Sequence, residues 1–150
     1  LLPKRATMRA MNLLKSRPYT EYQLRQKLSM GGYPQDAQEE AISYVKSYHY
    51  IDDRQYAMDY IEYHQESKTK QKLLQSLMSK GLSKELILEC FDEIVGDRKK
   101  ELEEEQILKI LRKKNYDPEQ WTFEEKQRLM ASLYRKGFSS ELIHVHFYLT

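Results

Sequence analysis

The chain has 150 residues, 40% of them apolar and 32% charged, and its 25 Lys and Arg against 23 Asp and Glu give a formal net charge of +2. This composition is typical of a soluble globular protein and lacks the strongly basic signature of a dedicated DNA-binding protein. No run approaches the roughly 18 apolar residues of a membrane helix, and the one cysteine excludes an internal disulfide and favours a reducing cytoplasm. Because the chain opens on Leu1 rather than Met, we expect residues to be missing from its N-terminus.

Three helices are predicted in the first fifty residues. The first ends before Pro18, because the residue before a proline is restricted away from helical geometry. The second begins at a capping box formed by Thr20 and Gln23, and the third follows Pro34, which suits the first turn of a helix. The apolar residues at helical spacing, predicted to face inward on the first and third helices, are Ala6, Ala10, Leu13, Leu14, Ala37, Ala41, Ile42, Val45 and Tyr48.

Three further helices are predicted before residue 96. The first of them begins at Asp52 or Asp53 as its N-cap, the next carries Leu73 and Leu77 on one face, and the last begins at Ser83. The other inward residues of this segment are predicted to be Tyr56, Ala57, Tyr60, Ile61, Leu86, Ile87, Cys90, Phe91 and Ile94.

The last third of the chain repeats this order. A long charged helix is predicted between residues 97 and 114, a second helix begins at a capping box formed by Thr122 and Glu125, and a third begins at Ser139. The inward residues of the first and third of these helices are predicted to be Leu102, Ile107, Leu108, Ile110, Leu111, Leu142, Ile143 and Phe147.

One pattern occurs three times. Residues 24–33, 73–82 and 129–138 all read Leu-x3-Leu-x3-Gly followed by an apolar residue, and their glycines lie 49 and 56 residues apart. Two leucines four apart share one helix face, and a glycine supplies the left-handed residue that ends the helix. The three glycines are Gly32, Gly81 and Gly137.

We therefore predict an all-α chain of three tandem three-helix-bundle repeats forming an elongated curved array. The predicted units are residues 1–50, 51–96 and 97–150. A unit of about fifty residues is marginally stable alone, so neighbouring units are expected to support one another. Such an array builds a surface rather than a pocket, which favours a binding protein over an enzyme.

Charge is distributed unevenly over these units. Lys and Arg exceed Asp and Glu by 4 in the first unit and by 1 in the third, whereas the second has a net charge of −3. A basic cluster is often only a solvated helix face, but exposed clusters can also contact phosphate or acidic partner patches. The predicted partner- or DNA-binding residues are Arg5, Arg9, Arg25, Lys27, Lys68, Lys70, Lys109, Arg112 and Lys113.

Tyrosine is abundant, with twelve residues against four Phe and one Trp. Four tyrosines fall on predicted inward faces, where a ring can be buried while its hydroxyl remains hydrated. They are Tyr44, Tyr48, Tyr56 and Tyr60. An exposed tyrosine beside Lys or Arg can contact a protein partner or stack on bases. Tyr19, Tyr22 and Tyr63 are examples of tyrosines outside these faces that are expected to be exposed.

Catalytic signatures are absent from the sequence. It contains no Gly-rich phosphate loop, no Gly-x-Ser-x-Gly and no Cys pair for zinc. His144 and His146 are two residues apart, which points them to different sides of a helix and suits one metal poorly. Cys90 is predicted to be a small core residue. We expect no enzyme activity, no cofactor and no metal.

Taken together, these motifs resemble the RecX family, modulators of the bacterial RecA recombinase. The most specific stretch is Tyr50-Ile51-Asp52-Asp53 followed by Tyr56, Ala57 and Tyr60. The chain departs from the family at Thr69, where many relatives have Gly, and in its long acid-rich helix after residue 97. The other matching positions are Ala10, Leu14, Arg17, Thr20, Glu21, Leu24, Arg25, Leu28, Gly32, Tyr33, Lys80-Gly81-Leu82 and Lys136-Gly137-Phe138.

The resemblance implies a non-enzymatic regulator acting in homologous recombination, DNA repair and the SOS response. Similar proteins lie in the groove of the RecA filament on single-stranded DNA and suppress ATP hydrolysis, strand exchange and coprotease activity. The expected partner is the RecA filament, with single-stranded DNA as a further candidate, and the chain is expected to be a cytoplasmic monomer. Two alternatives remain open: a helix-turn-helix DNA-binding protein, and a helical adaptor for another protein.

Overall fold

The computed structural model describes residues 2–148, with side chains from residue 4 onward. Over that range the chain forms nine α-helices and one short 3-10 helix, with no strand. The helices are α1 (Leu2–Ser16), α2 (Glu21–Met30), α3 (Gln35–Ser47), α4 (Asp53–His64), α5 (Lys70–Ser79), α6 (Lys84–Val95), η1 (Gly96–Arg98), α7 (Lys99–Lys113), α8 (Phe123–Arg135) and α9 (Ser140–Tyr148).

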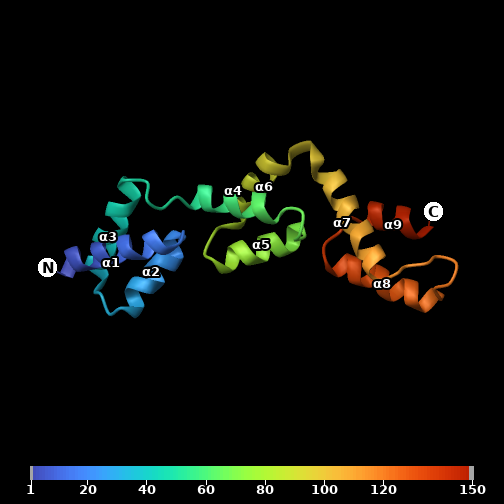
Figure 1. Cartoon of the computed structure of the whole chain (residues 1–150), viewed down its shortest axis with the longest axis horizontal. Helices are drawn as coiled ribbons and strands as arrows, with labels where there is room; N and C mark the ends of the chain where they lie inside the picture. Colours follow the sequence, from blue (N-terminus) through green and yellow to red (C-terminus); the bar gives the residue numbers. More distant parts are fainter. Residues whose placement is uncertain (1, 149–150) are drawn as a thin grey trace.

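The helices form three successive groups of three. Figure 1 shows α1–α3, α4–α6 and α7–α9 following one another along the long axis, with the two ends of the chain far apart. The predicted all-α fold of tandem three-helix bundles is therefore confirmed. No described helix combines the length and the apolar character needed to cross a membrane.

Each group has its own apolar core. In the first, four alanines of α1 and α3 (Ala6, Ala10, Ala37 and Ala41) are fully buried, and their small side chains let the two helices pack closely. The second core is built around Ile61, Leu73, Leu77 and Cys90, and the third around Ile107, Leu133 and Ile143. Cys90 is buried, as the sequence predicts.

Adjacent cores reach past the predicted unit boundaries. Ile51 packs into the first core, and Leu102 of α7 packs into the second. Each of these residues lies after a predicted boundary but packs into the core before that boundary. The unit boundaries at 50/51 and 96/97 therefore do not coincide with the limits of the cores, and they stay predictions.

The turn glycines adopt the left-handed conformation expected of them. Gly32, Gly81 and Gly137 have φ angles of 82°, 91° and 89°, a region in which a side chain is strained. After Gly81, the amide of Leu82 donates to the carbonyl of Leu77, and this bond satisfies a carbonyl left over at the end of α5.

The predicted caps are present. Thr20 and Thr122 both form complete capping boxes, with Gln23 and Glu125 as partners. Asp52 and Ser83 accept the N-cap hydrogen bonds of α4 and α6, as the sequence predicts. Pro34 was predicted in the first turn of α3 but stands one position earlier, as its N-cap, where its extended backbone introduces the helix.

Several predictions about buried side chains are wrong. Tyr44 and Tyr48 are 41% and 57% exposed, because Ala41, Ile42 and Val45 already fill the core side of α3. Tyr19 was assigned to the exposed set, yet it is buried in the first core, with the Arg17 guanidinium 3.8 Å from its ring centroid. The exposed Leu108 was also predicted to face inward. Tyr56 and Tyr60 are half-buried, whereas Tyr22 and Tyr63 are exposed as predicted.

Neighbouring groups are joined at two similar junctions. At the first, the Thr20 hydroxyl donates to the carbonyl of Lys80 over 2.6 Å, and the Glu21 amide donates to the Asp53 carboxylate over 2.9 Å. At the second, the Gln106 side-chain amide donates to the carbonyls of Gln65 and Lys68. These bonds join residues of different helix groups, so neighbouring groups stabilise one another.

The Thr20 side chain both caps α2 and bonds across the first junction, whereas Thr122 only caps α8 and so serves as its matched control. We expect Thr20→Val to lower the free energy of unfolding by about 2–3 kcal/mol, because it removes a helix cap and takes from the Lys80 carbonyl the hydrogen bond of a fully buried hydroxyl. Thr122→Val removes a capping box that is exposed, and should cost only about 1 kcal/mol. Urea unfolding followed by circular dichroism measures both, and equal losses would show that the junction bond adds nothing.

Candidate functional site

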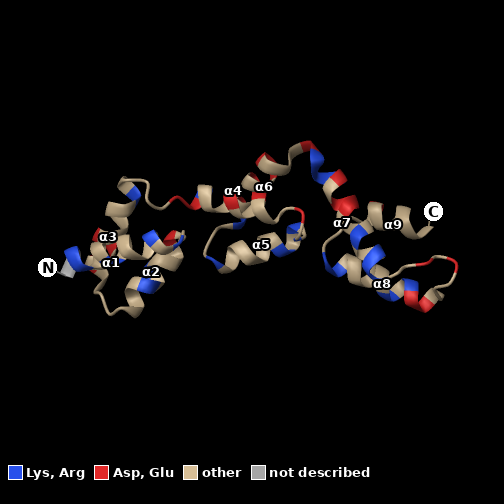
Figure 2. Cartoon of the chain, in the orientation of Figure 1, with Lys and Arg blue, Asp and Glu red and all other residues tan. Residues whose placement is uncertain are grey.

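The predicted basic residues do not form one site. Arg5 and Arg9 lie on α1, Lys27 lies on α2, and Lys109, Arg112 and Lys113 lie at the end of α7, all of them exposed. Within the described part of the chain, these six form no ion pair. They are therefore available to a partner, but they are spread along the array rather than gathered in one place (Figure 2).

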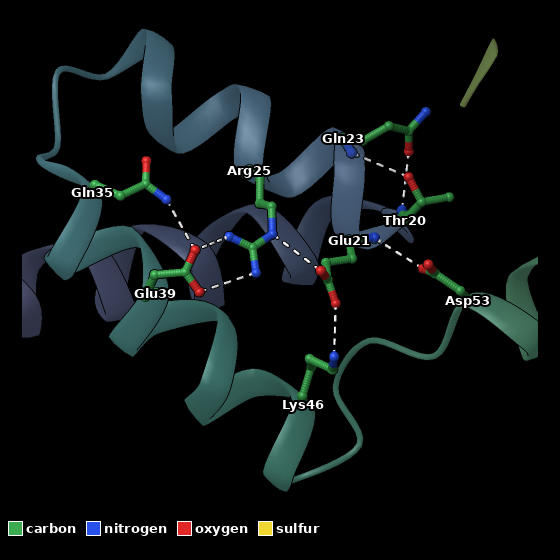
Figure 3. A network of polar contacts seen from close by, with 8 residues as sticks. All are labelled: Thr20, Glu21, Gln23, Arg25, Gln35, Glu39, Lys46 and Asp53. Atoms are coloured by element: carbon green, nitrogen blue, oxygen red, sulfur yellow. Dashed lines mark hydrogen bonds and ion pairs between the residues drawn. The ribbon is translucent and has the colours of Figure 1, made fainter. Parts of the chain in front are cut away.

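Arg25 differs from the other predicted cations because its guanidinium forms ion pairs with residues of the same helix group. Its guanidinium binds both Glu39 and Glu21, and Glu21 in turn binds Lys46 at 2.9 Å (Figure 3). These contacts raise the pKa of Arg25, with the hydrogen bond that its guanidinium donates to Glu39 as the main cause. Arg25 therefore ties α2 to α3 and is only partly exposed.

The same network gives the first group a dependence on pH. Hydrogen bonding with Lys46, and then with Arg25, lowers the pKa of Glu21, and hydrogen bonding with Arg25 lowers that of Glu39. Because the pKa of each carboxylate is lower in the folded state than in the unfolded state, its stabilising contribution is present above the unfolded pKa. That contribution is lost as the pH falls through the folded pKa.

We accordingly expect Glu21→Gln to reduce the acid sensitivity of the fold. The substitution should lower the free energy of unfolding at neutral pH by about 0.5 kcal/mol, as for a surface ion pair, and the loss should shrink as the pH falls through the folded pKa of Glu21. Glu62→Gln, at an exposed carboxylate with no ion pair among the described residues, serves as the control. Urea titrations at several pH values measure the difference, and identical pH profiles for the two variants would contradict this role of Glu21.

An aromatic recess lies where the first two groups meet. Arg17, Pro18, Tyr56, Asp59, Tyr60, Tyr63 and His64 line a recess of about 360 Å³. The ring centroid of His64 lies 4.3 Å from that of Tyr60 and 4.8 Å from that of Tyr63. Burial lowers the pKa of His64, and the nearby Lys68 and Lys80 lower it further. Half-buried rings beside cations of this kind are common at protein interfaces.

The Lys68 side chain connects this recess to the second junction. Its ammonium donates to the Tyr60 hydroxyl over 2.8 Å, and it also lines a cleft between α5, α7 and the turn before α9. The cleft has a volume of about 230 Å³ and a floor that includes the buried residues Phe91, Leu102 and Phe138. We call it the lysine cleft because four lysines line it: Lys68, Lys70, Lys99 and Lys136.

The lysine cleft disfavours the protonated form of two of its lysines, Lys70 and Lys136. Burial lowers the pKa of Lys70, and the neighbouring Lys99 lowers it further. The pKa of Lys136 is likewise lowered by burial, and then by Lys72, Lys114 and Lys113. Glu103 is the one carboxylate lining the cleft in the described structure, and it accepts the backbone amide of Ser139.

Of the nine predicted site residues, the structure brings only Lys68 and Lys70 together in this cleft. Sequence reasoning missed Lys99 and Lys136, which approach α5 from helices far along the chain. The sequence pattern that could have pointed to Lys136 is a lysine directly before the turn glycine, which occurs in both Lys80-Gly81 and Lys136-Gly137. Across the described residues, no group of three or more His, Cys, Asp and Glu is placed to hold a metal ion.

Comparison with known sequences identifies the family. The model of the first three-helix domain of RecX matches residues 6–44, and that of its third three-helix domain matches residues 101–144. The regulatory protein RecX of Caldanaerobacter subterraneus subsp. tengcongensis is 32% identical over 148 residues, which cover 98% of this chain and 71% of that protein. The regulatory protein RecX of Clostridium botulinum strain Eklund 17B is 33% identical over 128 residues, and the match covers 83% of this chain but 58% of that relative's length.

Two solved structures share the fold. A crystal structure of RecX from Lactobacillus salivarius aligns with a TM-score of 0.78 at 20% identity, covering 96% of this chain and 93% of that one. A crystal structure of a regulatory protein RecX aligns with a TM-score of 0.79 at 23% identity, covering 99% of this chain and 74% of that one. Because the models of the first and third domains match, and because one relative aligns over 98% of this chain, the chain belongs to the RecX family.

Proposed function

We propose that the chain is a non-enzymatic regulator of the RecA recombinase. It binds along the groove of the RecA filament on single-stranded DNA and reduces ATP hydrolysis, strand exchange and coprotease activity. The observation that carries the proposal is the alignment of 98% of the chain with a protein named as the regulatory protein RecX. On this proposal the chain acts as a monomer in the cytoplasm.

The form of the molecule supports a filament as the partner. Three helix groups in line present a long surface, which suits a partner that repeats along its own axis better than a small ligand. The six exposed cations of the predicted set lie in the first and third groups, and the aromatic recess and the lysine cleft lie at the two junctions between groups. A partner that follows this surface would meet basic or aromatic side chains along most of its length.

A RecA ATPase assay on single-stranded DNA tests the proposal. Adding the purified chain should lower the rate of ATP hydrolysis in a saturable, concentration-dependent way, and the same filaments should catalyse less strand exchange. A helix-turn-helix protein would instead bind duplex DNA with sequence preference and would leave RecA unaffected when the DNA is in excess. No change in ATPase rate or strand exchange at saturating chain would exclude the proposed activity.

A further inference from the structure

The two junctions are built from equivalent residues. Asp53 is the first residue of α4 and Lys99 is the first residue of α7, and the same offset of 46 residues relates the fully buried Ile61 to the fully buried Ile107. The N-caps Thr20 and Thr69 correspond at the starts of α2 and α5. The first helical residue after each cap is Glu21 at the first junction and Lys70 at the second.

At the first junction, the chain supplies its own anion to the start of α2. The Asp53 carboxylate accepts the Glu21 amide at 2.9 Å, so one of the amides left without a partner in the first turn of α2 is satisfied by a negative charge. This arrangement is favourable, because the N-terminal end of a helix carries a partial positive charge.

At the second junction, the corresponding anion is replaced by a cation. Lys99 stands at the position of Asp53, and its side chain lies beside that of Lys70. Lys68 and Lys136 complete the lysine cleft, and Glu103, the carboxylate in its lining, is engaged by the Ser139 amide. Lys70 and Lys99 are therefore adjacent where the first junction pairs Glu21 with a carboxylate, and the repulsion between their ammonium groups is relieved when an anion binds between them.

We propose that the lysine cleft is a binding site for a phosphate group, which takes the place that the Asp53 carboxylate occupies at the first junction. Four lysines match a group with several anionic oxygens better than they match a single carboxylate. The ammonium groups and the first amides of α5 donate to the phosphate, and the Lys70 ammonium already lies 5.1 Å from the centroid of the Phe91 ring at the cleft. The phosphate belongs either to a small polyphosphate or to a nucleic-acid backbone.

Further lysines outside the cleft help to distinguish a small polyphosphate from a nucleic-acid backbone. Lys72, Lys113 and Lys114 lie close enough to Lys136 to lower its pKa, so positive charge continues outward from the cleft. A single pyrophosphate reaches only the cleft, whereas a chain of phosphates reaches the outer lysines as well. The inference does not depend on RecA, and its test uses the purified chain alone.

The test is a titration of the chain with pyrophosphate, followed by NMR. We expect saturable shifts in the amide signals of residues 70–72 and 139–141, and competition from a twelve-residue oligothymidylate. Tighter binding of the oligonucleotide than of pyrophosphate would identify a nucleic-acid backbone as the source, and weaker binding would identify a small polyphosphate. Absence of saturable shifts with pyrophosphate at millimolar concentration would overturn the proposal, as would equal binding of a tetraglutamate peptide.

Lys99→Asp restores the residue type found at the first junction, and Lys84→Asp is its matched control. Both lysines are the first residue of a helix, and both substitutions change the net charge equally, but Lys84 lies outside the cleft. We expect Lys99→Asp to weaken pyrophosphate binding at least about tenfold and to raise the melting temperature, and Lys84→Asp to keep binding near that of the parent. Lys136→Gln is a second, uncharged test and should also weaken binding.

The Lys84→Asp control distinguishes a specific phosphate-binding site from nonspecific electrostatic attraction. Equal weakening in Lys99→Asp and Lys84→Asp would mean that only net charge matters, and the site would be ruled out. A lower melting temperature for Lys99→Asp would overturn the equivalence of the two junctions on which the inference rests.

Discussion

Gly81→Ala is expected to lower the free energy of unfolding by about 3 kcal/mol. The φ angle of 91° at Gly81 strains any side chain by about 1–2 kcal/mol. A Cβ added there would also lie 2.2 Å from the Cβ of Tyr22, so the turn after α5 has to move away from the start of α2. Overpacking of this kind adds about 1–3 kcal/mol. Urea unfolding followed by circular dichroism measures the loss.

Gly32→Ala is the matched control for this prediction. Gly32 has a φ angle of 82°, close to that of Gly81, but a Cβ added there would meet no atom within 4 Å. Its expected cost is therefore the backbone strain alone, about 1–2 kcal/mol. The difference between the two variants reports the contact between the first two helix groups. Equal costs would show that this contact does not stabilise the fold.

The second large effect concerns the exposed cations. Reversing Lys27, Arg112 and Lys113 to Glu is expected to raise the concentration of chain that half-inhibits the RecA ATPase about tenfold or more, because a basic contact with the filament becomes repulsive. The effect should shrink as salt is added, since exposed charges are screened. Arg25 is left intact because its ion pairs with Glu21 and Glu39 stabilise the fold.

The control for the reversal carries the same charge change at other exposed positions. Lys15→Glu, Lys84→Glu and Arg135→Glu lie outside the predicted contact set, and Lys15 and Arg135, like the three test residues, stand in the last turn of their helices. This variant is expected to inhibit nearly as well as the parent. Circular dichroism confirms that both variants are folded. Undiminished inhibition by the first variant at low and moderate salt would mean that the filament binds another face.

Most of the fold could be predicted from local signals. The threefold Leu-x3-Leu-x3-Gly pattern, the capping boxes at Thr20 and Thr122 and the helical spacing of apolar residues all depend on neighbours in sequence. The exposure of Tyr44 and Tyr48 could not be predicted in this way. Both lie next to true core positions on α3, and their burial depends on how α3 rotates against the alanines of α1.

The site was less predictable because it is assembled from distant residues. Lys68 and Lys70 are both predicted binding residues and lie two apart in the sequence, but Lys99 and Lys136 join them only when α7 and the turn before α9 pack against α5. Arg25 shows the opposite case. Its spacing from the leucines of α2 placed it on a polar face, but no local pattern indicates that Glu39 of α3 binds it.

The central claim is that the chain binds RecA filaments, and co-sedimentation tests it most directly. RecA filaments assembled on single-stranded DNA with a slowly hydrolysed ATP analogue are pelleted with increasing amounts of the chain, beside matched samples of DNA alone. We expect the chain to pellet with the filaments to a saturating ratio, and the variant with Lys27, Arg112 and Lys113 reversed to pellet less. If the chain remains in the supernatant with saturating filaments, it does not bind them and the proposed function is wrong.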